Sequence, residues 1–475
     1  MFSIRTFVHA VASLVCALGV AVAPRDHAAA DAGTVKVHAS PKPLSSAAGT
    51  QDWNAFLGPS HNGVSTETHL IKRWGAHGPP LVWEMEAGSG YASPSVARGR
   101  LVFLDRVGDV ERVECLDAET GKHHWTYEYP THYVDRYDFN NGPRASPIID
   151  GQRVYTYGAE GKLHCLDLET GHVLWAFDTS SRFKVHQDFF GVGSTPLIEG
   201  DLLVVNVGAP GGPEIVGFDK TDGTIRWQVG DKWTAGYASP IPADLSGKRR
   251  VLILCGGDSD PPRGGLLSLD PAGGEIEMRF PFRSKTYTSV NASTPVFAGG
   301  RVFISSSYHT GGVALDLKPD GSYAEAWRTR ELGAHFTTPI VRDGFLYGID
   351  GARENDTAIV CLDWKSGEKK WRSAPTWPEE FTHNGVTQVT RIGVFRGSLL
   401  LADGRFWILG ERGHLIQADL SPSGYREIQR TRLFNARETW TPPVLSRGLL
   451  YIRQNKPDQS NGKPPRLLCY DLRGD

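Results

Sequence analysis

One short motif recurs along this chain at intervals of about fifty residues. It combines an apolar run, an aspartate, a Thr-Gly or Ser-Gly step and, in the tightest copies, a tryptophan. These copies are ECLDAETGKHHW (114–125), HCLDLETGHVLW (164–175), VGFDKTDGTIRW (216–227) and VCLDWKSGEKKW (360–371). The aspartates of all the copies are Asp117, Asp167, Asp219, Asp270, Asp316, Asp363, Asp419 and Asp471. A fixed period of this length indicates a repeat architecture, in which each unit buries its apolar faces against its neighbours.

A Ser-Pro or Thr-Pro step runs in phase with this motif and precedes an apolar run in every copy except the seventh. Each repeat therefore predicts four short strands, of which the third ends at the aspartate and the fourth carries the tryptophan. The aspartate accepts hydrogen bonds from nearby backbone N–H groups, and the glycine supplies the positive φ that closes the hairpin. Eight such units predict an all-β fold, an eight-bladed β-propeller of four-stranded antiparallel blades.

The tryptophan of the repeat predicts how neighbouring blades join. It stands at the same distance from the aspartate in the four tightest copies, so we expect these side chains to dock between adjacent sheets. They are Trp125, Trp175, Trp227 and Trp371. The last repeat ends soon after Asp471 and lacks a fourth strand, whereas PPLVWEME (79–86) has the spacing of one and carries Trp83. We predict that residues 79–86 complete the last blade and close the ring, because closure pairs edges that would otherwise be open.

The first residues predict export. Arg5 precedes an apolar run at 7–23, which small residues follow. We expect residues 1–30 to form a signal peptide or an uncleaved anchor, residues 31–51 a flexible tether and residues 52–475 the propeller. The sequence therefore predicts a protein of the bacterial periplasm or cell envelope, in contact with the membrane only through an uncleaved N-terminal segment.

Charge and the cysteine pattern exclude two kinds of site. Lys and Arg number 51 against 53 Asp and Glu, a net charge of −2, which is not the balance of a nucleic-acid binder. Cys115, Asp117, His123 and His124 are residue types that bind metals, but other copies carry Gly, Ser or Ala at the cysteine position. That indicates a small packed slot, so we expect free buried thiols, two solvated turn histidines and no metal.

The A-x-D-x-x-T-G-x-x-x-W-type repeats, the Ser/Thr-Pro strand openers and the eight blades resemble the pyrroloquinoline-quinone-like β-propeller superfamily. This superfamily includes the quinoprotein alcohol dehydrogenases and the propeller lipoprotein of the outer-membrane β-barrel assembly machine. The resemblance covers about residues 52–475 and includes segments outside the repeat, such as WNAFLGPSHNGVS (53–65) and WTPPVLSRGLLYIR (440–453). It implies the fold, and it implies either an enzyme or a scaffold, because this fold carries both.

The resemblance to quinoprotein dehydrogenases implies a quinone stacked on a tryptophan, a calcium ion, an aspartate base and a disulfide between adjacent cysteines. This sequence has no adjacent cysteine pair and no C-x-x-C-H haem motif. We therefore expect a non-catalytic scaffold without a cofactor, whose partner is an envelope protein or a small ligand. The alternatives are a quinoprotein oxidoreductase that uses pyrroloquinoline quinone (PQQ) with calcium, and a binder of an anionic or sugar-like ligand at the channel mouth.

The crossings from the fourth strand of one blade to the first strand of the next should all emerge on one face of the ring. Residues just before each Ser/Thr-Pro step should rim the central channel, where converging aromatic and cationic groups favour a ligand site. The competing interpretation is that they plug the channel and hydrogen-bond one another. The candidates are Tyr91, Arg144, His186, Trp233, Tyr237, Lys285, Tyr287, His335, His383, Asn384, Arg437 and Trp440.

Overall fold

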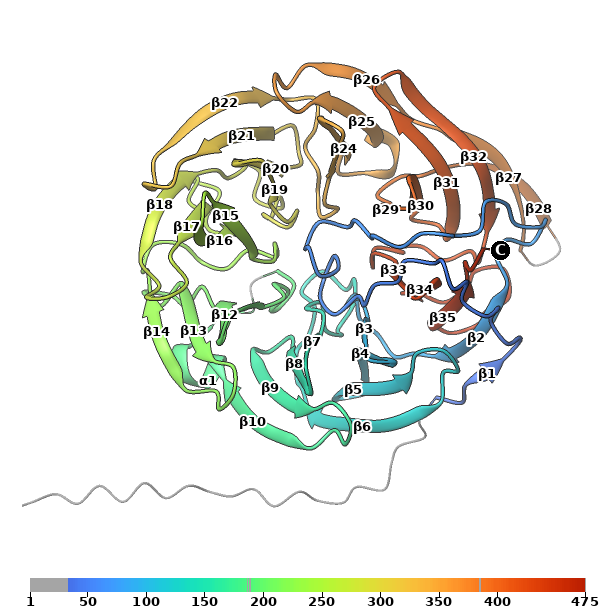
Figure 1. The fold of residues 1–475 in the computed structure, drawn as a ribbon, viewed down its shortest axis with the longest axis horizontal. Helices are drawn as coiled ribbons and strands as arrows, with labels where there is room; N and C mark the ends of the chain where they lie inside the picture. Colours follow the sequence, from blue (N-terminus) through green and yellow to red (C-terminus); the bar gives the residue numbers. More distant parts are fainter. Residues whose placement is uncertain (1–32, 186, 188, 384–385, 475) are drawn as a thin grey trace, which may run out of the picture. The chain divides into compact units, whose positions relative to one another are not determined.

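Eight antiparallel sheets surround a central axis in the computed structural model, which describes residues 33–185, 187, 189–383 and 386–474 (Figure 1). Blade 1 contains β3 (Ser95–Ala97), β4 (Arg100–Val107), β5 (Val110–Asp117) and β6 (His123–Pro130). Blade 2 contains β7 (Ile148–Asp150), β8 (Arg153–Tyr157), β9 (Lys162–Asp167) and β10 (Val173–Asp178). Blade 3 contains β11 (Leu197–Glu199), β12 (Leu202–Asn206), β13 (Ile215–Asp219) and β14 (Ile225–Val229). Blade 4 contains β15 (Ile241–Leu245), β16 (Lys248–Cys255), β17 (Gly265–Leu269) and β18 (Ile276–Pro281).

The second half of the ring repeats this plan. Blade 5 contains β19 (Val296–Ala298), β20 (Arg301–Ser306), β21 (Gly311–Leu317) and β22 (Tyr323–Thr329). Blade 6 contains β23 (Ile340–Arg342), β24 (Phe345–Asp350), β25 (Ala358–Asp363) and β26 (Lys369–Ser373). Blade 7 contains β29 (Ser398–Ala402), β30 (Arg405–Leu409), β31 (His414–Ser421) and β32 (Gly424–Arg432). Blade 8 contains β33 (Val444–Ser446), β34 (Leu449–Gln454), β35 (Arg466–Asp471), β2 (Leu81–Glu86) and β1 (Lys36–Val37). A short helix, α1 (Thr179–Phe183), follows β10, and a 3-10 turn, η1 (Glu354–Asp356), precedes β25.

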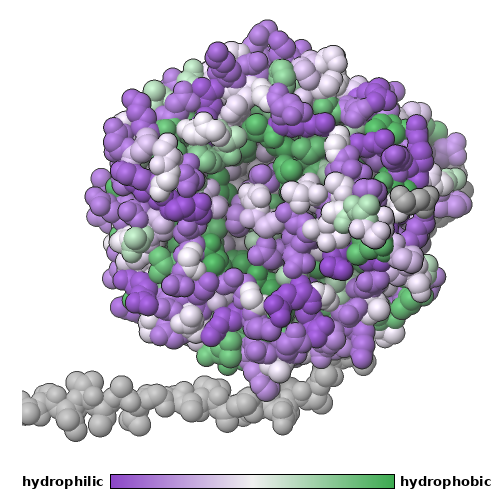
Figure 2. Space-filling view, viewed as in Figure 1, coloured by the Kyte–Doolittle hydropathy of each residue, from purple (hydrophilic) through white to green (hydrophobic). Residues whose placement is uncertain are grey.

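The core lies between the blades. Strands such as β13 and β17 are buried along their whole length, so both faces of a sheet pack on neighbours. Figure 2 shows polar side chains over the periphery of the ring and hydrophobic side chains gathered around its hollowed centre. This is the burial pattern that an eight-bladed propeller requires, and the predicted fold class is confirmed.

The repeated turn works as the sequence predicts. In blade 1 the Asp117 Oδ1 atom accepts hydrogen bonds from the Thr120 backbone N–H at 2.8 Å and from its hydroxyl at 2.7 Å. Gly121 follows with a φ of 73°. The ring of Trp83 from the neighbouring blade lies 2.9 Å from the point where a Cβ would stand on Gly121. The glycine is therefore required both by its left-handed backbone and by the tryptophan packed against it.

The four repeat tryptophans dock their blades on the next ones, as predicted. The indole N–H of Trp125 donates to the Leu168 carbonyl oxygen at 2.8 Å, and Trp175 donates to Lys220 at 3.1 Å. Two more such bonds join Trp227 to Pro271 at 2.9 Å and Trp371 to Ser421 at 2.7 Å. Each acceptor lies just after the repeat aspartate of the following blade. The large indole thus fills the space between two sheets, and its polar atom is satisfied there.

The ring closes where the sequence predicts. β2 pairs with β35 in antiparallel register, with Trp83 opposite Cys469. The indole N–H of Trp83 donates to the Ala118 carbonyl oxygen at 3.3 Å, which joins blade 8 to blade 1. Residues 79–86 therefore supply the outer strand that the last repeat lacks.

Residues 33–51, expected to form a flexible tether, instead pack against blade 8. β1 pairs with β2 through Lys36 opposite Glu84 and Val37 opposite Trp83, which makes this sheet five-stranded. The Lys42 backbone N–H donates to Asp471 at 2.7 Å. The free edge of β2 offers backbone partners that the sequence pattern does not reveal. The predicted signal peptide or anchor lies outside the described residues.

A second difference concerns His383, which was expected to rim the channel. It belongs to β27 (Thr376–His383), which pairs with β28 (Val386–Gly393) at the outer edge of blade 7 (Figure 1). The hairpin is held there by Trp377, whose ring lies 3.9 Å from the Arg430 guanidinium of β32. His383 is the last residue of β27, so its placement at the channel mouth is wrong. Asn384 lies outside the described residues.

The cysteines of the described residues, Cys115 among them, are buried and free, as expected. Burial raises the pKa of the Cys115 thiol to about 12. His123 and His124, however, are not solvated turn residues. They are the first residues of β6 and half-buried, and His123 contacts Glu114 at 3.2 Å. No helix in the described part of the chain is both long enough and apolar enough to cross a membrane.

Candidate binding site

A cavity of about 410 Å³ lies at one end of the channel. Because strands alternate in direction, the loops between second and third strands and those between fourth and first strands emerge on this same face. Several predicted candidates line the cavity together: Tyr91, Arg144, Tyr237, His335 and Trp440. This volume is within the range of small-molecule sites.

The N-terminal segment crosses the other end of the channel. Trp53 pairs with Val96 in β3, and Val64 pairs with Leu401 in β29. Figure 1 shows this blue segment passing across the middle of the ring. Phe56, between these two contacts, lines the cavity. The cavity therefore has a floor contributed by a segment far from the other lining residues in sequence.

Aromatic rings form most of the wall. The ring of Trp440 has its centroid 5.2 Å from Phe336, 5.3 Å from Tyr91 and 5.6 Å from Phe139. Phe190 continues the wall, with its centroid 5.4 Å from the ring of Tyr237. Rings at these separations support one another in tilted and edge-on arrangements. The wall presents a mostly apolar surface to any guest.

Two arginines are built into this wall. Arg144 donates to Asp135 at 2.5 Å, and its guanidinium lies 5.2 Å from the centroid of Phe190. Arg396 binds Glu411 at 2.5 Å and lies 4.7 Å from the centroid of Trp440. Both charges are therefore neutralised by buried carboxylates and stacked on the rings, a favourable geometry for a guanidinium.

Other polar groups of the lining lack hydrogen-bond or ion-pair partners among the described residues. Ser398 is 3% exposed, and its Oγ atom is buried without a hydrogen-bond partner among the described residues. The Nδ1 atom of His335 is buried in the same condition. Burial lowers the pKa of His335 to about 4, so its imidazole is neutral at pH 7. Arg353 is exposed at the edge of the cavity and makes no ion pair within the described part of the chain.

Residues at the mouth also hydrogen-bond one another, as expected from the competing interpretation in which they plug the channel. The Tyr91 hydroxyl donates to Glu438 at 2.8 Å, and burial raises the pKa of Tyr91. The Phe190 backbone N–H donates to the Tyr237 hydroxyl at 3.0 Å. These bonds fix the wall, and the cavity remains between them.

The other candidates lie elsewhere. Tyr287 is 53% exposed at the rim, with its ring centroid 4.8 Å from Phe189, which lines the cavity. Trp233 packs between blades 3 and 4, and its backbone N–H donates to Glu214 at 2.6 Å. Lys285 and Arg437 are exposed and do not line the cavity. His186 lies outside the described residues.

The sequence analysis missed several lining residues. Phe139, Phe190 and Phe336 lie in the predicted crossings, and their apolar character within polar loops is a signal that was available. Tyr308 and Arg353 lie in loops between second and third strands, which no repeated motif marks. These loops reach the same face for the topological reason given above.

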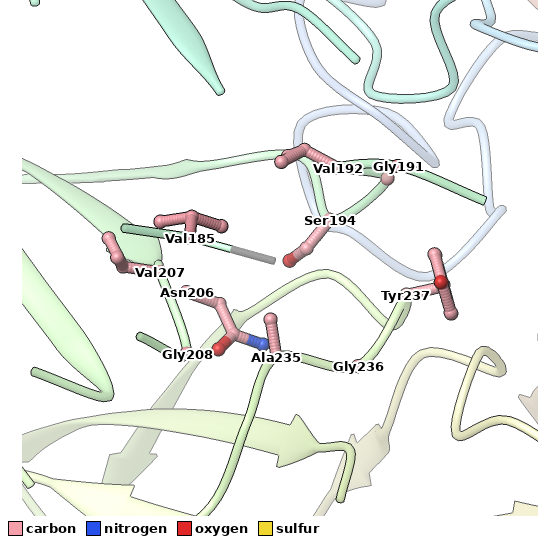
Figure 3. Close-up of a pocket in the computed structure, with 11 residues that line it drawn as sticks. Val185, Gly191, Val192, Ser194, Asn206, Val207, Gly208, Ala235, Gly236 and Tyr237 are labelled. Carbon is pink, nitrogen blue, oxygen red and sulfur yellow. The ribbon is translucent and has the colours of Figure 1, made fainter. Parts of the chain in front are cut away.

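A much smaller cavity of about 20 Å³ adjoins the first and shares Gly193 and Tyr237 with it. Figure 3 shows the Asn206 side chain in its wall, between Gly208 and Ala235. Both polar atoms of this amide are buried without a partner among the described residues. The space is sufficient for one water molecule, which is the usual partner of such a group.

The lining does not fit a calcium-bound quinone. Calcium takes six to eight oxygen ligands, mainly from carboxylates, amides and carbonyls. Among the described residues, no Asp, Glu, Asn or Gln lines the large cavity, and the nearby Asp135 and Glu411 are bound to arginines. Within the described residues, no group of three or more His, Cys, Asp or Glu side chains is placed to hold a metal ion.

Comparison with known proteins agrees with the fold. A family model described as outer membrane protein assembly factor BamB matches residues 110–373. Among solved structures, BamB from Moraxella catarrhalis is 16% identical, with a TM-score of 0.53 over 83% of this chain and 98% of that one. A europium-containing methanol dehydrogenase is 11% identical, with a TM-score of 0.64 over 89% of this chain and 98% of that one. The quinohemoprotein alcohol dehydrogenase from Comamonas testosteroni is 12% identical, with a TM-score of 0.63 over 89% and 81%. No curated protein sequence matches the chain. At these identities the likeness to the solved structures is one of fold.

Proposed function

The chain belongs to the family described as outer membrane protein assembly factor BamB, and on this premise we propose that it is an exported, non-catalytic scaffold of the bacterial cell envelope. It binds a partner at the channel mouth. The observation that carries the proposal is the aromatic cavity of about 410 Å³ with Phe56 as its floor. A concave, mostly apolar site with a few polar groups is the usual form of a binding site.

The rim around the cavity supports a partner larger than the cavity itself. Tyr287 is 53% exposed and Tyr137 is 37% exposed, although both are aromatic. Aromatic residues exposed together at a concave site are typical of interaction surfaces. The rim continues the aromatic wall outward, because Tyr137 stacks on Phe189 with ring centroids 5.5 Å apart.

Site-directed photocrosslinking in living cells tests this proposal. A photoreactive phenylalanine analogue replaces Tyr287 at the rim in the full-length chain. The matched control replaces Tyr323, which is 40% exposed on β22 away from the mouth. We expect a discrete adduct with an envelope component from position 287 only. Adducts of equal yield from both positions, or from neither, would count against binding at the mouth.

The alternative function is a PQQ-dependent quinoprotein oxidoreductase. Its support is the fold shared with the two dehydrogenase structures, and the absence of carboxylate and amide side chains from the described residues of the cavity lining speaks against it. Reconstitution with quinone and calcium separates the two functions.

A further inference from the structure

The lining of the cavity also restricts the chemistry of its guest. On the basis of the proposed function, in which this cavity is a binding site, we infer that the guest of the cavity is a hydrophobic organic acid. The apolar, ring-bearing body of this guest lies against Trp440, Phe336 and Phe190, and its single acidic group lies at Arg353. The sequence predicted an anionic or sugar-like guest, and a cation is the third class that an aromatic site can bind.

A cationic guest is disfavoured because two fixed arginines already lie over three of the lining rings, those of Tyr91, Phe190 and Trp440. The Arg144 guanidinium lies 5.2 Å from the centroid of Phe190 and 5.5 Å from that of Tyr91. Arg396 lies 4.7 Å from the centroid of Trp440. A second cation would have to share these rings with two fixed positive charges. Aromatic cages bind cations when the rings are free, which these are not.

A sugar is disfavoured because the lining lacks the groups that pair with many hydroxyls. In the described part of the chain no Asp, Glu, Asn or Gln side chain lines the cavity, and the polar groups present are several hydroxyls, one imidazole, one indole N–H and the arginines. Each buried sugar hydroxyl without a partner would lose its hydrogen bond to water, which costs free energy. An apolar guest has no such hydroxyls, so it loses no hydrogen bonds to water when it packs against the same wall.

An acidic group, in contrast, meets an available partner. Arg353 stands at the edge of the cavity, and within the described residues its guanidinium has no ion pair. Asp356 lies in the same turn, but it accepts hydrogen bonds from the backbone N–H groups of Ala352 and Arg353, at 3.1 and 2.7 Å. A guanidinium binds carboxylate or sulfonate oxygens through charge-assisted hydrogen bonds.

A second observation at the inner part of the cavity points to a ligand as well. The Ser398 Oγ atom and the His335 Nδ1 atom are buried without hydrogen-bond partners among the residues that the structure describes, and both residues line the cavity. Such groups are rare in folded proteins unless water or a ligand satisfies them. A carbonyl or acid oxygen that enters the cavity would accept a hydrogen bond from the Ser398 hydroxyl. The lining thus combines an apolar wall with donors for a small number of oxygen atoms.

Two fluorescent probes that differ only in charge test this inference on the purified full-length protein. Anilinonaphthalene sulfonate carries one acidic group, and N-phenylnaphthylamine has the same ring system without it. We expect the wild type to bind the sulfonate about three- to tenfold more tightly than the neutral probe at low salt. Arg353→Gln should abolish this preference and leave the affinity for the neutral probe unchanged.

Two further variants control the experiment. Arg437→Gln removes an exposed arginine that does not line the cavity, and it should retain the preference for the sulfonate. Ala292→Phe adds a ring to the lining and should weaken the binding of both probes, which locates them in the cavity. Thermal unfolding of each variant establishes that it is folded.

The outcomes separate the inference from the proposed function. Equal affinity for the two probes in the wild type, or a preference that survives in Arg353→Gln, would overturn the acidic guest and leave the cavity as a binding site. If the cavity binds neither probe, or if Ala292→Phe changes nothing, the cavity itself is rejected as the site. Loss of the preference in Arg353→Gln alone supports the inference.

Discussion

The indole N–H of Trp83 donates to the carbonyl oxygen of Ala118 at 3.3 Å, across the boundary between blade 8 and blade 1. Trp83 belongs to a strand near the start of the chain that completes the last sheet, and it is fully buried. The same bond joins Trp125 to Leu168 within the continuous part of the ring. The closure therefore uses the same contact as every other junction that the repeat tryptophans make.

Replacing Trp83 should open this junction. Trp83→Ala removes a buried indole at the closing blade, and we expect the free energy of unfolding to fall by about 3–5 kcal/mol. Chemical denaturation measures this change. Val173→Ala, at an exposed position of β10, should stay within about 0.5 kcal/mol of the wild type. A Trp83→Ala protein as stable as that control would mean that β2 does not hold the ring closed.

Two glycines with similar backbones separate strain from packing. Gly151 and Gly171 have φ values of 59° and 73°, but a Cβ at Gly151 meets no atom within 4 Å, whereas one at Gly171 lies 2.6 Å from the Trp125 ring. Gly151→Ala should cost about 1–2 kcal/mol from the left-handed backbone alone. Gly171→Ala should cost about 1–3 kcal/mol more because it displaces the indole. Equal losses in denaturation would show that the tryptophan adapts freely.

His164 predicts an acid-sensitive junction between blades 1 and 2. It is 5% exposed, its ring centroid lies 4.4 Å from that of Tyr129, and burial lowers its pKa from 6.5 to about 4. Between these values the unfolded chain binds a proton that the folded protein does not. Stability is therefore full above pH 6.5 and falls as the pH drops towards 4, by at most about 3 kcal/mol for this group.

The variant His164→Phe isolates this effect, because phenylalanine keeps the ring contact with Tyr129 and cannot titrate. Urea denaturation at pH 7 and pH 4.5 should show a smaller loss of stability in the variant than in the wild type. Burial raises the pKa of the nearby Glu111, but that carboxyl is present in both proteins and cancels in the comparison. Identical losses would place the acid sensitivity elsewhere.

Reconstitution tests the proposed absence of quinone chemistry. We expect the purified protein, supplied with PQQ and calcium, to reduce no dye in the presence of alcohols, because the lining residues that the structure describes offer calcium no carboxylate or amide ligand. A quinoprotein dehydrogenase treated in parallel serves as the positive control. Dye reduction that requires both the quinone and calcium would favour the enzyme.

The fold was predictable because the repeated motif is determined by contacts within one repeat and between neighbouring repeats. A turn that needs an aspartate acceptor and a positive φ, such as the turn of Asp117 and Gly121, requires the same residue types in the tight copies of the motif. A tryptophan that must reach the next blade keeps a fixed distance from that turn. These constraints act within one repeat and its neighbour, so periodicity reveals them.

The cavity was predictable only in part. Tyr91, Arg144, Tyr237, His335 and Trp440 were found because the topology brings every crossing to one face. Phe56 enters from the other end of the channel, and Arg353 comes from a loop that no motif marks. The hairpin β27–β28 lies at the edge of blade 7 because Trp377 packs there, a tertiary contact that an irregular insertion does not reveal. The identity of a loop residue depends on the site that the loop forms and not on the packing of the repeat, so periodicity carries no information about it.

The segment that carries Phe56 affects how a guest enters and leaves the central channel. Trp53 and Val64 attach it to the inner strands of blades 1 and 7, across the end of the channel that faces away from the mouth. Because Phe56 of this segment lines the cavity from that side, we expect a guest to enter and leave at the mouth and not to pass between the two faces of the propeller. We then expect the residence time of the guest to depend on whatever covers the mouth.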